Sequence, residues 1–331
     1  MKTNKLTEAS MLSALFIVIS IMAIGSGIGY SVYLDILVPI IAALIYFKCN
    51  LKYGIMSLIC SLVIICLVVG DVASGIFMVQ GIVIGISCGI IINRKQSIYD
   101  DLVFCSILSC VVMIFIDLYF RGLTGVSFLE QFKSMSQSFS DSEMIQNAMY
   151  YVLTIALPMG TVFCTNLGAL FFGKKLNLLS KNATNKFMLV SNFRKYGSFL
   201  CCSKKVISIS IIYIVFAQIF TYLNIFTEYV YLNTTINILK YVLLYFILED
   251  SFTFMAKYLY STFKSKRLVN IAQLITLTVI IFNFKVASIF LVLLNLVINR
   301  KFNFRNKQFV YLNNNNLFSL SSEDKYIRKA S

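Results

Sequence analysis

Apolar stretches of this chain are separated by loops that are alternately rich and poor in Lys and Arg. All but four of the 29 Lys and Arg residues lie in alternate loops or near the ends of the chain. The basic segments are residues 2–5, 48–52, 94–95, 174–205, 257–267 and 300–331. Because positively charged loops stay on the cytoplasmic side of a membrane, this pattern predicts a multi-pass membrane protein. It also predicts cytoplasmic N- and C-termini, and we expect the protein in the cell membrane.

The apolar stretches are too long and too numerous for the core of one soluble domain. Hydrophobic residues make up 59% of the chain, well above the usual share. Several stretches have the length that spans a bilayer, roughly 20 residues: Leu6–Ile24, Gly54–Val69, Val72–Ile92, Leu102–Phe120, Ala148–Phe172 and Val206–Ile225. Unbroken apolar stretches satisfy their backbone hydrogen bonds as helices, so the sequence predicts an all-α transmembrane bundle of about 8–10 spans.

The charge pattern divides the chain into four regions. Residues 1–172 predict a six-helix membrane unit, 173–205 a basic cytoplasmic connector, 206–300 a C-terminal membrane helical unit, and 301–331 a disordered cytoplasmic tail. In the first unit, a short span from Leu34 to Phe47 carries Pro39, whose missing N–H should kink the helix. After the fifth span, apolar residues recur at helical spacing from Phe128 to Phe139, which predicts an amphipathic helix on the outer surface.

The C-terminal unit leaves two questions open. One span starts near Thr235 and can run past Glu249 and Asp250 towards Lys264. These two carboxylates mark either a polar groove within that span or the point where the membrane ends. Residues 268–299 form either two short spans or a re-entrant pair.

Composition excludes several function classes. The net charge of +15 does not indicate nucleic-acid binding, because membrane orientation and anionic lipid already explain positive charge in short cytoplasmic loops. No cleavable signal peptide is expected at the N-terminus. The nine cysteines fall in predicted spans or cytoplasmic loops, so no external disulfide framework is expected.

The chain contains no His, which removes the usual catalytic triads and disfavours a zinc site. We expect neither enzymatic activity, nor a metal, nor a cofactor. The segment from Gly168 to Lys175 has the spacing of a phosphate-binding loop, but it lacks the Ser or Thr that holds magnesium. The chain is therefore not expected to hydrolyse ATP by itself.

The segment Leu6–Leu15, the glycine-rich turn after it and the Pro-bearing second span resemble the start of S-components. These proteins are the substrate-capture subunits of energy-coupling-factor (ECF) vitamin transporters. The longer chain, with its basic connector and the ending at Leu291–Arg300, is similar to YybS-like bacterial membrane proteins, whose N-terminal half is itself S-component-like.

The resemblance implies capture of a small solute, such as a vitamin, from the outer side. It also implies a transmembrane coupling subunit with ATPases as partners. S-components pack against that subunit through an Ala-xxx-Ala motif on the first helix. This chain offers Ala9-xxx-Ser13 or Ser10-xxx-Ala14 in its place. A second set of small residues, Gly81, Gly85 and Gly89, predicts close helix packing.

Four polar residues of the first unit are the candidate substrate-binding residues: Asp71, Asp117 and Arg121 at the outer ends of its spans, and Gln80 inside the fourth span. Polar groups that converge in an apolar pocket are typical of a ligand site. Each also has a purely structural interpretation. Asp71 can cap a helix, Gln80 can bond between helices, and Asp117 can pair with Arg121 one turn away.

Three functions fit these observations. The leading one is substrate capture, which predicts a closed cavity lined by the four residues and covered by the 128–139 helix. The second is a non-transport membrane scaffold or regulatory protein, which predicts a solidly packed interior. The third, a secondary transporter, predicts inverted repeats, and the two halves of this sequence show no clear repeat.

Overall fold

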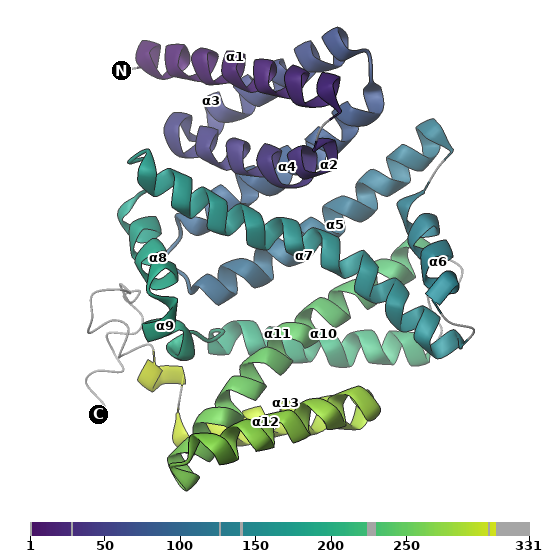
Figure 1. Ribbon diagram of the computed structural model, residues 1–331, viewed down its shortest axis with the longest axis vertical. Coiled ribbons are helices and arrows are strands. Elements are labelled where there is room, and N and C mark those ends of the chain that lie inside the picture. Colours follow the sequence, from purple (N-terminus) through teal and green to yellow (C-terminus); the bar gives the residue numbers. More distant parts are fainter. Residues whose placement is uncertain are drawn as a thin grey trace. The chain divides into compact units, whose positions relative to one another are not determined.

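The computed structural model describes residues 2–27, 29–125, 127–139, 142–223, 230–303 and 305–308, and these residues contain helices and no strand (Figure 1). Seven helical segments in this part of the chain are long and apolar enough to cross a membrane. The prediction of an all-α, multi-pass helical bundle is confirmed. The chain forms two compact units, residues 1–96 with 104–190 and residues 97–103 with 191–331, and each is described by itself.

The first unit begins with α1 (Lys2–Ser26), the short α2 (Tyr30–Val32), the π-helical turn η1 (Tyr33–Leu37) and α3 (Val38–Val69). It continues with α4 (Val72–Ile92), the part of α5 (Ile98–Thr124) from residue 104, α6 (Phe128–Phe139), α7 (Glu143–Lys175) and α8 (Lys181–Ser191). The predicted amphipathic helix at 128–139 is confirmed as α6. The predicted connector 173–205 is divided, because α8 belongs to this unit and the residues from 191 to the other.

Helix α3 reverses its direction at Asn50, where the backbone leaves helical geometry with a positive φ of 65°. Its first half runs beside α4 and its second half beside α1, where the hydroxyls of Ser13 and Ser61 lie 2.6 Å apart. One continuous helical segment therefore supplies both the second and the third predicted span.

Pro39 lies in the first turn of α3, directly after the π-helical turn η1. A proline is tolerated there because its missing N–H falls where the helix type changes and no regular bond is lost. The structure thus accommodates Pro39 by a change of helix type before it, and the large change of direction in this segment lies at Asn50.

The glycines of α4 are buried against the first half of α3. A Cβ atom added to Gly81 would lie 2.9 Å from Val38 Cγ1, and one added to Gly89 would lie 2.7 Å from Tyr46 Cδ1. Between them, a Cβ on Gly85 would meet the Pro39 carbonyl oxygen. Small residues let two backbones approach, so this ridge packs within the first unit.

Helix α8 covers the C-terminal end of α4. Lys186 is buried and donates to the Ile91 carbonyl oxygen at 3.3 Å, and Asn182 donates to the Asn93 carbonyl oxygen at 3.1 Å. These donors bond to carbonyl groups at a helix end, where the regular helical donors are missing. A cation here also complements the negative end of the helix dipole.

The second unit contains the start of α5, α9 (Phe193–Tyr196), the 3₁₀ turn η2 (Gly197–Phe199), α10 (Lys204–Tyr222) and α11 (Val230–Phe263). As the sequence allowed, α11 runs past Glu249 and Asp250. Its 34 residues extend about 50 Å, which exceeds the roughly 30 Å of bilayer hydrocarbon.

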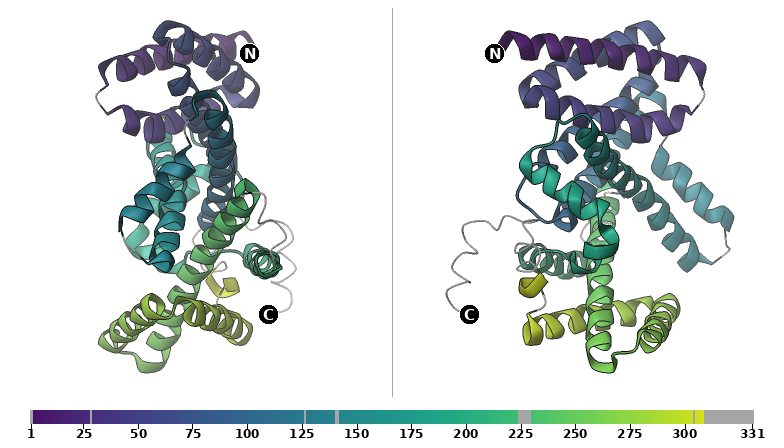
Figure 2. Two further views of the ribbon diagram at one scale, coloured as in Figure 1. Left: turned by 90° about the vertical axis from the view of Figure 1, so that its right-hand side faces the viewer. Right: turned by 60° about the vertical axis from the view of Figure 1, so that its left-hand side comes forward.

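Helices α12 (Lys266–Phe282) and α13 (Phe284–Phe302) form a hairpin that turns at Asn283 and packs against α11 (Figure 2). The predicted tail from residue 301 overlaps with described structure, because α13 ends at Phe302 and more helix follows it. Residues 305–308 are helical, and both Arg305 and Gln308 are buried. Most of the predicted tail, including the four Asn at 313–316, lies outside the described residues.

Candidate functional site

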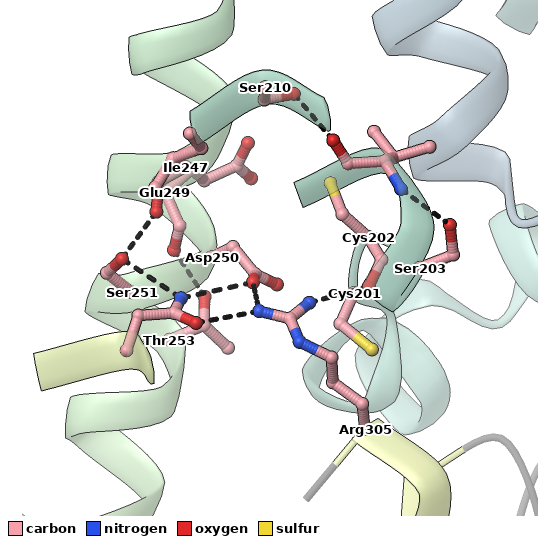
Figure 3. Close-up of polar contacts among 12 residues, drawn as sticks. Cys201, Cys202, Ser203, Ser210, Ile247, Glu249, Asp250, Ser251, Thr253 and Arg305 are labelled. Carbon is pink, nitrogen blue, oxygen red and sulfur yellow. Dashed lines mark hydrogen bonds and ion pairs between the residues drawn. The ribbon is translucent and has the colours of Figure 1, made fainter. Parts of the chain in front are cut away.

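A buried ion pair joins α11 to the segment after α13 in the second unit (Figure 3). The side chains of Arg305 and Asp250 are only 3% and 1% exposed. Taking two charges out of water costs several kcal/mol per ion unless the remaining hydrogen-bonding groups are satisfied. The surroundings of this pair therefore decide its role.

Further polar groups surround the pair. Arg305 donates to the Asn295 side-chain oxygen at 2.8 Å and to the Cys202 carbonyl oxygen at 2.6 Å. Asn295 in turn donates to Asp250 at 3.2 Å and to the Ser251 hydroxyl at 3.0 Å. We call these five residues the Asp250–Arg305 cluster. It ties together α11, α13, the segment before α10 and the segment after α13.

Additional polar groups come from the first turn of α5. Asp100 accepts a hydrogen bond from the Ser203 amide at 2.8 Å, and the Tyr99 hydroxyl donates to Glu249 at 2.6 Å. The guanidinium carbon of Arg305 also lies 4.7 Å from the centre of the Phe254 ring. The cluster is thus extended by partnered groups, as expected for polar side chains in a buried site.

Cys202, a member of the cluster, and the neighbouring Cys201 are poor nucleophiles. Burial raises the pKa of the Cys201 thiol to about 12, and the pKa of the Cys202 thiol is raised well above its usual value by the same cause. A thiol reacts as its thiolate, so both are inert at neutral pH. Among the described residues, no group of three or more His, Cys, Asp or Glu side chains could hold a metal ion.

Sequence reasoning missed this cluster. It noticed Glu249 and Asp250 but assigned Arg305 to the tail. The available signal was an Asp within an apolar helix, since an intramembrane carboxylate calls for a partner. The partner is 55 residues away in the chain, and nothing in the local pattern identifies it.

The predicted site residues all lie in the first unit: Asp71 caps α4, Gln80 lies within α4, and Asp117 and Arg121 lie near the end of α5. Asp71 is the N-cap of α4 and accepts from the Ala73 and Ser74 amides at 3.0 and 3.3 Å. It also accepts from the Ser74 hydroxyl, which lies 2.5 Å from the Tyr30 hydroxyl. These contacts satisfy the free amides of a helix start.

Asp117 and Arg121 contact different partners at the start of α6. The Asp117 carboxylate exposes no surface and accepts from the Ser127 hydroxyl at 2.8 Å and the Phe128 amide at 2.5 Å. Arg121 forms an ion pair with Glu130 at 2.9 Å, and both side chains are about half exposed. The pattern placed the two residues on one helix turn, and the structure directs each of them to α6.

Three aromatic rings pack beneath the first turn of α6. The centre of the Phe77 ring lies 5.4 Å from that of Phe120 and 5.1 Å from that of Phe128. The rings of Phe120 and Phe128 stack with their centres 4.9 Å apart.

Gln80 is partly buried in α4. Because Asp117 exposes no surface, it does not line an open cavity in this conformation.

The two small-residue pairs of α1 face opposite ways. Ala9 and Ser13 are buried, and Ser13 bonds to the second half of α3. Ser10 and Ala14 are exposed. Only the second pair is accessible to another protein.

Comparison of this chain with protein-family models, with curated proteins and with solved structures found no match.

Proposed function

We propose that this membrane protein is a substrate-capture subunit similar to the S-components, with α6 as the helix that covers the site. It would take up a small solute and have no ATPase activity of its own. The proposal places the protein in the cell membrane with both termini in the cytoplasm, as the distribution of Lys and Arg supports.

The observation that carries the proposal is the way in which Asp117 is satisfied. A buried carboxylate needs compensation, and here two neutral donors at the start of α6 provide it. Donors on a covering helix can be exchanged for the donors of a ligand when that helix moves. The half-exposed ion pair between Arg121 and Glu130 opposes such a movement only weakly, because exposed pairs contribute about 0–1 kcal/mol.

The exposed face of α1 is an argument for a partner protein in the bilayer. Ser10 and Ala14 form the small-residue pair that remains accessible, and small residues let a second helix approach closely. Under this proposal they contact a coupling subunit, whereas Ala9 and Ser13 hold α1 to α3.

The test is purification of the intact protein in mild detergent, with mass spectrometry of bound small molecules and of co-purifying proteins. A retained metabolite that disappears in Asp117→Asn and persists in the control Lys133→Gln, an exposed residue of α6, supports capture. Recovery of a coupling subunit with its ATPases supports the transport system. Retention of neither contradicts the proposal.

A second candidate, a non-transport scaffold or regulatory protein, is favoured by a specific observation. Asp71 and Asp117 are both satisfied as helix caps without a ligand, and the rings of Phe77, Phe120 and Phe128 contact one another directly. In the same purification, this candidate predicts regulatory or cell-envelope proteins and no metabolite.

A further inference from the structure

The first unit has a groove of about 360 Å³ on the surface formed by the end of α4 and the adjoining part of α5. Its walls are the apolar side chains of Ile91, Phe104, Ile107, Leu108 and Val111. The four residues from Phe104 to Val111 recur at the spacing that places them on one face of α5. They extend over about 10 Å of its length. The groove is therefore an apolar channel that follows a helix.

Polar groups lie at one end of this groove, in the loop after α4. Arg94 and Gln96 both line it. Arg94 is exposed and forms no ion pair with any described residue. The amide oxygen of Gln96 is buried and has no hydrogen-bond partner in the described part of the chain. A free cation and an unsatisfied acceptor thus adjoin an apolar channel.

Two backbone acceptors next to Arg94 in the chain already have donors. The carbonyl oxygens of Ile91 and Asn93 at the end of α4 already accept from Lys186 and Asn182. The side chain of Arg94 is therefore left for an outside anion. The adjacent Lys95 is also exposed and adds a second positive charge at the same end.

We infer that this groove binds an anionic phospholipid of the surrounding bilayer, with an acyl chain along α5 and the phosphate at Arg94. A headgroup hydroxyl or ammonium would satisfy Gln96. The wall residues are large, whereas close helix–helix contacts in membranes are enriched in small residues, so an acyl chain fits this groove better than a second helix. The distribution of Lys and Arg predicts that this loop is cytoplasmic, and that leaflet carries the anionic lipids. The inference does not depend on substrate capture.

The probe pair is dioleoyl phosphatidylglycerol and dioleoyl phosphatidylcholine, which share their chains and differ in headgroup charge. Native mass spectrometry of the full chain in mild detergent measures the lipid bound at increasing lipid concentration. Wild-type protein is expected to retain the anionic lipid preferentially. Arg94→Gln should weaken that binding about five-fold, the loss typical of one basic side chain near an anionic surface.

Two matched controls make the experiment decisive. Lys52→Gln removes an exposed positive charge from another basic segment and should change the affinity less than two-fold. Leu108→Trp fills the groove and should reduce binding of both lipids, whereas Leu67→Trp, at a position 79% exposed outside the groove, should not. Equal effects of Arg94→Gln and Lys52→Gln, or full binding by Leu108→Trp, would overturn the inference. Thermal unfolding of each variant verifies that it is folded.

Discussion

Two buried carboxylates of this protein, Asp117 in the first unit and Asp250 in the second, are compensated in different ways. Asp117 accepts hydrogen bonds from neutral groups at the start of one helix. Asp250 faces the guanidinium of Arg305, which is itself bound to two further elements. A hydrogen bond to a charged group contributes about 1.5–3 kcal/mol net, whereas breaking a buried ion pair costs about 3–5 kcal/mol.

The two carboxylates differ in how readily their hydrogen-bonding partners can be replaced. The partners of Asp117 lie at the start of one short helix, and a ligand or water that donates hydrogen bonds can take their place. The partners of Asp250 hold several elements together, and no single one can leave without exposing a buried charge to an apolar environment. We therefore interpret the first carboxylate as part of a movable site and the second as part of a fixed one.

The largest effect is expected at the fixed site. Arg305→Ala leaves Asp250 buried without its cation and should lower the free energy of unfolding by about 3–5 kcal/mol, measured by denaturant titration in mild detergent. The double variant Asp250→Leu/Arg305→Met should recover most of this loss, because it removes both charges. A loss below about 1 kcal/mol for Arg305→Ala would contradict the fixed interpretation.

Thiol labelling tests whether the cluster stays closed. In a variant with Cys201 as its only cysteine, labelling at pH 8 should be at least about a hundredfold slower than at an exposed cysteine, because burial raises the thiol pKa to about 12. The matched control carries Lys204→Cys at an exposed position nearby. The pKa of Cys201 is raised only in the folded protein, so the unfolded protein loses the thiol proton at a lower pH. The free energy of unfolding should therefore fall as the pH rises from about 9 towards 12. Equal labelling rates in the two variants would show that the cluster opens readily.

A smaller effect is expected at the movable site. Asp117→Ala leaves the Ser127 hydroxyl and the Phe128 amide without their acceptor, which should cost about 1–3 kcal/mol. Hydrogen exchange should increase in α6 and remain unchanged in α11. If exchange rises equally in both helices, Asp117 stabilises the whole chain and the contrast between the two sites is wrong.

The smallest effect is expected for the ion pair at the rim of α6. Glu130→Gln removes the partner of Arg121, and both side chains are half exposed, so the free energy of unfolding should change by less than about 1 kcal/mol. Raising the salt concentration should reduce the difference between wild type and variant further. A change as large as that of Asp117→Ala would mean that the pair holds α6 closed.

Local patterns predicted much of the fold. The repeat of apolar residues located α6 at Phe128–Phe139, and the spacing of Gly81, Gly85 and Gly89 predicted close helix packing. Both signals arise within one helix, where periodicity determines which residues share a face. The same reasoning placed Asp117 and Arg121 on one turn but could not identify their partners on α6.

The sequence by itself determined that this chain is helical and crosses a membrane several times, because apolar length and the distribution of Lys and Arg are properties of each segment alone. Only the tertiary structure decided that Asn50 reverses α3, that Ser13 faces inward while Ser10 faces outward, and that Arg305 meets Asp250. Such pairings depend on how helices pack across tens of residues, and a buried charge selects its partner by proximity in space.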